Sequence, residues 1–155
     1  MAVAWLVLIC LLSSWSALAA AGGRAGAVDG DTLAFADRRV DLFAIVAPAP
    51  QQVCREWVRQ RQRDYRCGAH ATAFLNSLVA GRSVFCIDED SGADIVRATC
   101  FADGRDLGRA MVRAGWALAD RRQSDRYVRD EEVARRDKVG LWVGAFEPPT
   151  GGAGQ

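Results

Sequence analysis

Three aspartates in the first third of the chain could act together in chemistry: Asp29 and Asp31, which flank Gly30, and Asp41 further along. Carboxylate oxygens are hard ligands, so a cluster of this kind could hold a divalent cation. The run Asp29-Gly30-Asp31-Thr32 also has the composition of a tight turn between two strands, which needs no cation. The sequence therefore leaves both a carboxylate site and a plain turn open here.

A second group of reactive side chains is a cluster of arginines from Arg55 to Arg66. Its members are Arg55, Arg59, Arg61, Arg63 and Arg66, with Glu56 and Asp64 among them. Guanidinium groups bind phosphate oxygens, so Arg59, Arg61 and Arg63 are candidate nucleic-acid contacts. The whole chain has a net charge of only +1, whereas dedicated nucleic-acid binders usually carry a basic excess. A solvated loop is the alternative to a phosphate-binding surface, and it is the one the charge balance favours.

Four of the five cysteines, Cys54, Cys67, Cys86 and Cys100, lie beyond the N-terminal leader. Cys86 and Cys100 each lie in a strand-like run, so we expect a disulfide across two neighbouring strands. Cys54 and Cys67 would then close the arginine-rich segment, which should add on the order of 3 kcal/mol of stability. Other pairings and a four-cysteine zinc site are the alternatives, although no Cys-x-x-Cys spacing is present. Paired thiols indicate an oxidising compartment.

The N-terminal residues predict export to the periplasm or the medium. Residues 1–21 carry no charged side chain, residues 2–15 form an apolar run, and the small-residue stretch that follows suits signal peptidase. No basic residue precedes the apolar run, so an uncleaved membrane anchor stays open as the alternative. We therefore expect a signal peptide at 1–21, one domain at 22–147 and a disordered tail at 148–155.

The residue pattern after the leader predicts a mainly β domain with helices. Strand-forming runs bounded by turn residues occur at 25–28, 32–35, 39–45, 83–87 and 97–101. Helical spacing of apolar residues occurs at 69–80, at 106–114 with Asp106 as N-cap, and from 124 or 125 to Gly140. Alternating acidic and basic residues on the last helix predict a solvated, salt-bridged surface. This order of elements fits a five-stranded Greek-key barrel of the OB type with three helices.

Several short motifs follow one another in a defined order along the chain. They are Val28-Asp29-Gly30-Asp31-Thr32, Ile45 with Ala47-Pro48, Cys67-Gly68-Ala69, Gly104-Arg105-Asp106-Leu107-Gly108, Met111-Val112-Arg113-Ala114-Gly115 and Gly140-Leu141-Trp142. Any one of them is weak, but the set in this order resembles the staphylococcal nuclease (thermonuclease) family in its exported bacterial form, over residues 24–147. The resemblance implies an OB barrel with three helices, in agreement with the elements expected above.

The resemblance also implies an activity, the calcium-dependent hydrolysis of phosphodiester bonds in DNA or RNA. In that family two aspartates and a backbone carbonyl hold calcium, a glutamate positions or activates water, and two arginines stabilise the transition state. Hard oxygen ligands suit calcium, and guanidinium forks suit phosphate oxygens.

This sequence keeps little of that set when the roles are carried over position by position. Asp31 falls on the first metal-ligand aspartate, whereas Val46 falls on the second and cannot ligate calcium. Ala49 stands where the glutamate is expected, and Asp41 reverses the charge of the first arginine. An ungapped count places Ile95 at the second arginine. The active site is therefore predicted to be degenerate.

Arg97 is the nearest arginine to that last position, but its use requires a gap or a shifted strand. Loss of one preorganised donor costs about 2 to 4 kcal/mol of transition-state stabilisation, and here several groups are replaced together. The sequence thus favours a catalytically impaired domain that acts as an envelope binding or interaction module without a cofactor. An active nuclease that uses Ca2+, and a rearranged carboxylate site for another metal or substrate, are the alternatives. The expected partners are an envelope protein or weakly bound nucleic acid, and the expected state is a monomer.

Overall fold

A computed structural model describes residues 22–91 and 96–150 of the chain. The expected signal peptide at 1–21, the position of Ile95 and the end of the expected tail lie outside the described residues. No helix within these two ranges is long and apolar enough to span a membrane.

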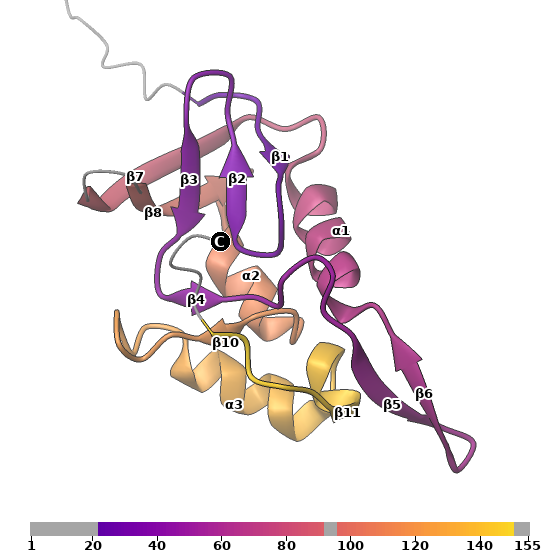
Figure 1. Cartoon of the computed structure of the whole chain (residues 1–155). Helices are drawn as coiled ribbons and strands as arrows, with labels where there is room; N and C mark the ends of the chain where they lie inside the picture. The colour runs from indigo at the N-terminus through magenta and orange to yellow at the C-terminus, as the bar shows by residue number, and fades with distance from the viewer. Residues whose placement is uncertain (1–21, 92–95, 151–155) are drawn as a thin grey trace, which may run out of the picture.

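The centre of the fold is a strongly curled sheet with strand order β1-β2-β3-β8-β7 (Figure 1). These strands are β1 (Gly26–Ala27), β2 (Thr32–Ala34), β3 (Arg39–Leu42), β7 (Val84–Ser91) and β8 (Val96–Ala102). All neighbours are antiparallel except β3 and β8, which run parallel. A bridge between Gly23 and Val84 joins the N-terminal segment to β7 and so curls the sheet toward closure. The predicted five-stranded barrel of the OB type is confirmed.

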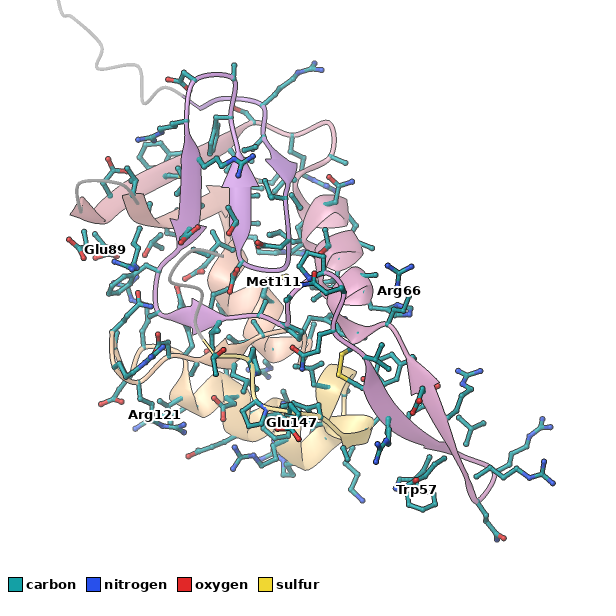
Figure 2. The ribbon with its side chains drawn as sticks, viewed as in Figure 1. Trp57, Arg66, Glu89, Met111, Arg121 and Glu147 are labelled. Atoms are coloured by element: carbon teal, nitrogen blue, oxygen red, sulfur yellow. A yellow bond between two sulfur atoms is a disulfide. The ribbon has the colours of Figure 1, made fainter. Side chains whose placement is uncertain are left out.

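Alternation along the strands builds the main core inside this curled sheet. Leu33, Val40, Leu42, Ala98 and Cys100 point inward and are almost completely buried, because neighbouring side chains on a strand face opposite sides. Helices α1 (Cys67–Val79), α2 (Leu107–Arg113) and α3 (Val128–Asp137) pack around it. Figure 2 labels one of their core residues, Met111, which is fully buried. The expected N-cap is confirmed, since the Asp106 carboxylate accepts the Arg109 N–H at 2.9 Å.

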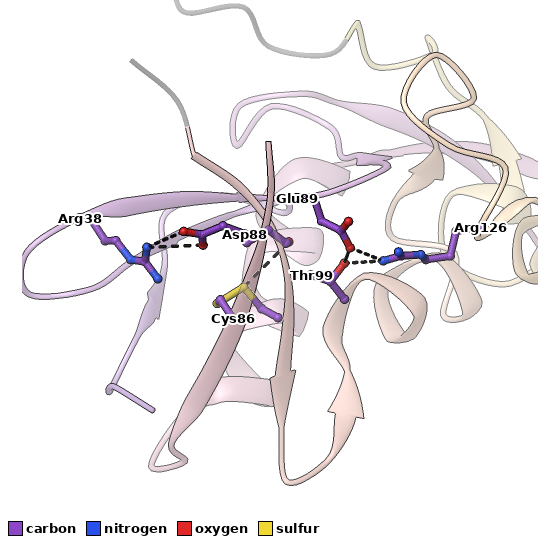
Figure 3. The surroundings of a disulfide bond; sticks show 8 residues. Arg38, Cys86, Asp88, Glu89, Thr99 and Arg126 are labelled. Atoms are coloured by element: carbon purple, nitrogen blue, oxygen red, sulfur yellow. Dashed lines mark hydrogen bonds and ion pairs between the residues drawn. A yellow bond between two sulfur atoms is a disulfide. The ribbon is translucent and has the colours of Figure 1, made fainter. Parts of the chain in front are cut away.

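Both predicted disulfides are present. Cys86 and Cys100 are directly opposite each other on β7 and β8, with their Cα atoms 4.0 Å apart. Figure 3 shows this bridge and the polar side chains around it. Cys54 is joined to Cys67, the first residue of α1, with a Cα separation of 5.6 Å. With Leu141, these two cysteines form the buried part of a second, smaller core.

The arginine-rich segment between Cys54 and Cys67 is mostly exposed and closed by a disulfide, as expected, but it is a β-hairpin and not a loop. Its strands are β5 (Cys54–Val58) and β6 (Arg61–Tyr65), and the short strand β11 (Gly144–Ala145) pairs with the other edge of β5. The two turn residues, Arg59 and Gln60, both have positive φ angles, 48° and 66°, which is typical of tight hairpin turns. Neither is Gly or Asn, so the turn carries no sequence signal. Figure 1 shows the hairpin projecting from the body of the domain.

The single strand expected at 39–45 is interrupted. Ala44 has a φ of 59°, and the chain turns there before β4 (Ile45–Val46), which pairs with β10 (Leu118–Ala119). Two hydrogen bonds to the chain after β10 hold Ala44 in this conformation. Its N–H donates to the Gln123 side chain at 3.2 Å, and its carbonyl accepts the Asp120 N–H at 2.9 Å. Because both partners are distant in sequence, the local apolar run gives no signal of the kink.

The helix ends also differ from the expected ones. Helix α1 begins two residues before the predicted start, and α3 begins at Val128 rather than near Ser124. Helix α3 ends at Asp137 because Lys138 adopts the left-handed conformation, with φ of 51°. A separate 3-10 turn, η1 (Gly140–Val143), follows. The short strands β4, β9 (Arg105–Asp106), β10 and β11 were not expected from the sequence.

Candidate functional site

The turn between β1 and β2 uses the first aspartate for its own backbone. The Asp29 carboxylate accepts the N–H groups of Asp31 and Thr32 at 3.0 and 2.7 Å, the pattern of an Asx turn. Gly30 is required here, because a Cβ at this position would lie 2.6 Å from that of Ala47. The interpretation as a turn therefore accounts for Asp29 and Gly30 without a ligand.

Asp31 points inward from the same turn and is tied to the chain after β4. Its Oδ2 accepts the Ala47 N–H at 2.6 Å, while its backbone carbonyl accepts the Leu42 N–H at 2.7 Å. Burial raises the pKa of the Asp31 carboxyl to about 8; the Ala47 N–H opposes this rise, and the nearby carboxylates of Asp29 and Asp41 add to it. At neutral pH this carboxyl is therefore mostly protonated.

Asp41 lies on the outer face of the sheet, in a polar row that crosses three strands. Thr32 on β2 donates its hydroxyl to Asp41 Oδ1 at 3.0 Å, and Arg97 on β8 is the parallel partner of Asp41. Burial raises the pKa of Asp41, and the Thr32 hydrogen bond and the Arg97 charge oppose that rise. The strand pairing thus places Arg97 beside Asp41. Arg97 is the arginine nearest to the expected second arginine position, and Asp41 is the carboxylate at the expected first arginine position.

Arg97 itself contacts a further carboxylate. Its Nη1 lies 3.3 Å from Asp90 Oδ2 on β7, and about a third of its side chain is exposed. The outer face at this place therefore carries one guanidinium between two carboxylates. This arrangement has no net positive charge that could attract a phosphate.

The two other substituted positions that the structure describes supply no oxygen ligand or base. Val46 is buried in β4, and its hydrocarbon side chain occupies the place of the second expected ligand. Ala49 is exposed in the loop after Pro48. Within residues 22–91 and 96–150 no group of three or more His, Cys, Asp or Glu side chains is arranged to hold a metal ion. The residues present therefore do not fit the calcium site of the family, and we assign no step to a metal.

The candidate nucleic-acid residues are not brought to this site, because they lie on the projecting β5–β6 hairpin. Arg63 donates to Glu56 at 2.8 Å, and Arg55 lies 3.6 Å from Asp64, so both charges are partly neutralised within the hairpin. Arg59 and Arg61 lie at its turn, where Trp57 on β5 is 62% exposed. Figure 2 shows Trp57 on this arm, away from the sheet.

One polar group on the outer face was missed by the sequence reasoning. Arg126, from the loop before α3, lies 2.8 Å from Glu89 Oε1 and also contacts Thr99, whose hydroxyl donates to the same oxygen at 2.6 Å (Figure 3). The Arg126 guanidinium also lies 5.5 Å from the centre of the Phe43 ring. Three separate segments supply this group, so local sequence patterns carry no signal for it.

The expectation that the acidic residues of the last helix are all solvated is wrong for Glu131. This carboxylate is 3% exposed, and it accepts the Ala119 N–H at 2.8 Å and Arg135 Nη2 at 2.9 Å. Asp120 is also buried and is bonded to Arg122, which lowers its pKa to about 2. Both carboxylates fix the chain around β10 rather than decorate a surface.

Comparison with known proteins identifies relatives of this fold and site. Residues 39–144 match the family described as "Staphylococcal nuclease homologue". The chain is also similar to "Succinoglycan biosynthesis protein ExoI" of Rhizobium meliloti (strain 1021), with 35% identity over 126 residues. That alignment covers 77% of this chain but only 63% of the relative, so the chain spans less than two thirds of the relative's length. The family match extends over more than half of the chain and includes β3, β7 and β8 of the curled sheet and all three helices, and the chain therefore belongs to the staphylococcal nuclease homologue family.

Proposed function

We propose that this chain is an exported staphylococcal-nuclease-like domain that has lost phosphodiester hydrolysis and acts as a binding module in the cell envelope. The observation that carries the proposal is Asp41. It lies on the outer face of β3, hydrogen-bonded to Thr32 and opposite Arg97, at the position where the family resemblance requires a phosphate-binding arginine.

Two physical effects act together at that position. The missing guanidinium removes about 2 to 4 kcal/mol of transition-state stabilisation, as for other preorganised donors. The carboxylate that replaces it also repels a phosphate anion, while Arg97 is shared with Asp90 and Asp41 and cannot serve the phosphate alone. Val46 and Ala49 remove the second metal ligand and the general base independently of this effect.

The envelope location is supported by the two disulfides, which form and persist in oxidising compartments. The similar protein of Rhizobium meliloti is named for succinoglycan biosynthesis, and we take this name as the second support for an envelope-associated role. The sequence and fold identify no single partner. An envelope protein, or nucleic acid held weakly by Arg59 and Arg61, remains within this proposal, and the domain is proposed to act as a monomer.

An active secreted calcium-dependent nuclease is the second candidate function. Membership of the nuclease family and the retained Asp31 favour it. A cation ligand must be deprotonated, so calcium binding at Asp31 would release the proton that this carboxyl holds at neutral pH.

A nuclease assay separates the two candidates. We expect the purified chain to show no calcium-stimulated cleavage of single-stranded DNA or RNA above a blank without protein. The combined variant Asp41→Arg, Val46→Asp, Ala49→Glu is the matched comparison, and adding Ile95→Arg completes the set that the resemblance requires. Any gain should appear only in the fourfold variant, because the groups act as a unit. Cleavage by the unmodified chain within a factor of about 100 of an intact family member would refute the proposed loss of activity.

A further inference from the structure

A cleft of about 520 Å³ lies on the side of the domain formed by β10, α3, η1 and β11. Its polar lining consists of Arg121, Glu131 and Arg135, and its aromatic lining consists of Trp142 and Phe146. It shares no residue with the Asp31 and Asp41 group on the sheet. Figure 2 labels Arg121 at one end of this region, below the sheet and beside α3.

The charges at the cleft are arranged around one buried carboxylate. Glu131 Oε1 lies 2.9 Å from Arg135 and 3.8 Å from Arg121, and Oε2 is occupied by the Ala119 N–H. Both guanidinium groups are about half exposed, whereas the Glu131 side chain is 4% exposed. Two cations therefore face one anion, and the excess of one positive charge is the part that solvent and ligands can reach.

The Arg135 side chain is held in place before any ligand arrives. Its guanidinium carbon lies 4.5 Å from the centre of the Trp142 ring, and its Nη2 is bonded to Glu131. A planar guanidinium fixed in this way loses little conformational entropy when it binds a carboxylate with its remaining N–H groups.

The walls of the cleft are apolar and carry one unused donor. The Trp142 and Phe146 rings meet edge to face with centroids 5.1 Å apart, and Leu118, Ala145 and Pro148 complete the lining. The indole Nε1–H of Trp142 is buried and has no hydrogen-bond partner among the described residues. A buried donor without a partner is unfavourable by about 1 to 3 kcal/mol, so Trp142 is the least satisfied side chain of the lining.

We propose that this cleft binds an anionic saccharide, with the carboxylate of a uronic-acid unit on Arg121 and Arg135 and its ring against Trp142 and Phe146. A sugar ring offers an apolar C–H face for the aromatic walls and hydroxyl groups for the open, solvent-facing side of the cleft. A single excess positive charge suits a monoanion better than a phosphate dianion. The volume lies within the range of small-molecule sites. The inference rests on the proposal that the domain works by binding, and it adds the class of ligand.

Isothermal titration calorimetry of the purified chain with oligogalacturonate tests this inference. We expect millimolar or tighter binding, a loss of at least about tenfold in Arg135→Gln and Arg121→Gln, and no binding of a neutral malto-oligosaccharide of the same length. Arg136→Gln is the matched control, because Arg136 lies on the same helix but contacts Asp137 and does not line the cleft. Arg121 lies outside α3, is half exposed and lies 3.8 Å from Glu131, so its variant keeps the test informative should Arg135→Gln unfold.

Three results would overturn the inference: no heat with oligogalacturonate at ten times the expected dissociation constant, equal affinity for citrate, or an equal loss of affinity in Arg136→Gln. Equal affinity for citrate would mean a plain anion site without a sugar. The nuclease assay depends on other residues, so saccharide binding by a chain that cleaves DNA would refute the proposed loss of activity and leave this inference standing. A chain that neither cleaves DNA nor binds the saccharide would refute this inference and leave the proposed loss of activity standing.

Discussion

Replacing Asp31 by Asn should make the domain more stable at alkaline pH, since the folded state holds this carboxyl in its neutral form. Asn keeps an oxygen that can accept the Ala47 N–H, so the contact survives while the ionisation is removed. Burial raises the folded-state pKa to about 8 from an ordinary value of 3.8. When a group has a higher pKa in the folded state than in the unfolded state, the free energy of unfolding is unaffected below the unfolded pKa. It falls as the pH rises from the unfolded pKa to the folded pKa.

The size of the effect follows from the same two pKa values. One pKa unit corresponds to about 1.4 kcal/mol. Because Asp31 ionises in the unfolded state but stays largely neutral in the folded state, the free energy of unfolding is lower by up to about 5 kcal/mol at pH 8. The free energy of unfolding of the unmodified chain should therefore fall between about pH 4.5 and pH 8. The Asp31→Asn variant should show a much flatter profile, with equal stability near pH 4 and a gain of several kcal/mol at pH 8.

Urea unfolding followed by circular dichroism across this pH range measures the difference directly. Asp37→Asn is the matched control, because Asp37 is an exposed carboxyl in the turn between β2 and β3, and this variant should follow the unmodified chain. If Asp31→Asn kept the slope of the unmodified chain between pH 5 and pH 8, the assignment of a buried, neutral Asp31 would be refuted.

Two further predictions concern the parts that hold the C-terminal half together. Glu131→Ala should lower the free energy of unfolding by about 2 to 4 kcal/mol, because it leaves the Ala119 N–H and Arg135 without their acceptor, whereas Glu132→Ala on the exposed side of α3 should change it by less than about 0.5 kcal/mol. Similar losses in the two variants, measured by urea unfolding, would contradict the anchoring role of Glu131. Cys54→Ala combined with Cys67→Ala should cost about 3 kcal/mol, as expected for a bridge between residues 13 apart, and should raise the proteolysis rate of the β5–β6 hairpin above that of the sheet. Uniform proteolysis along the chain would argue against a hairpin fixed by this bridge.

The elements whose signals are local could be predicted from the sequence. The strands at β1, β2, β7 and β8, the helix with its Asp106 cap and both disulfides follow from alternation, spacing and turn residues. The β5–β6 hairpin could not be predicted, because Arg59 and Gln60 adopt the positive φ angles that usually require Gly or Asn. The kink at Ala44 was equally hidden, since its partners lie on the chain after β10.

The parts of the candidate site also differ in whether the sequence could predict them. The resemblance assigns roles to Asp31, Val46, Asp41 and Ala49 by counting along the chain, which needs no three-dimensional information. The pairing of Asp41 with Arg97 depends on the register of two parallel strands that a long connection separates, and the ungapped count pointed to Ile95 instead. The group around Arg126 combines side chains from three segments, and Glu131 on α3 binds the backbone of β10, so only the folded chain reveals them.

The pairing of β11 with β5 has a consequence for the order in which this domain can fold. Gly144 packs so closely against β5 that an added Cβ would lie 1.9 Å from the Arg55 carbonyl, and Leu141 fills the small core beside the Cys54–Cys67 bridge. Both residues follow strands β1 to β10 and all three helices in sequence order. The hairpin therefore docks through contacts between distant parts of the chain, which form late because a long loop must first be closed. The two cysteines are close in sequence, so their bridge can form before the hairpin docks.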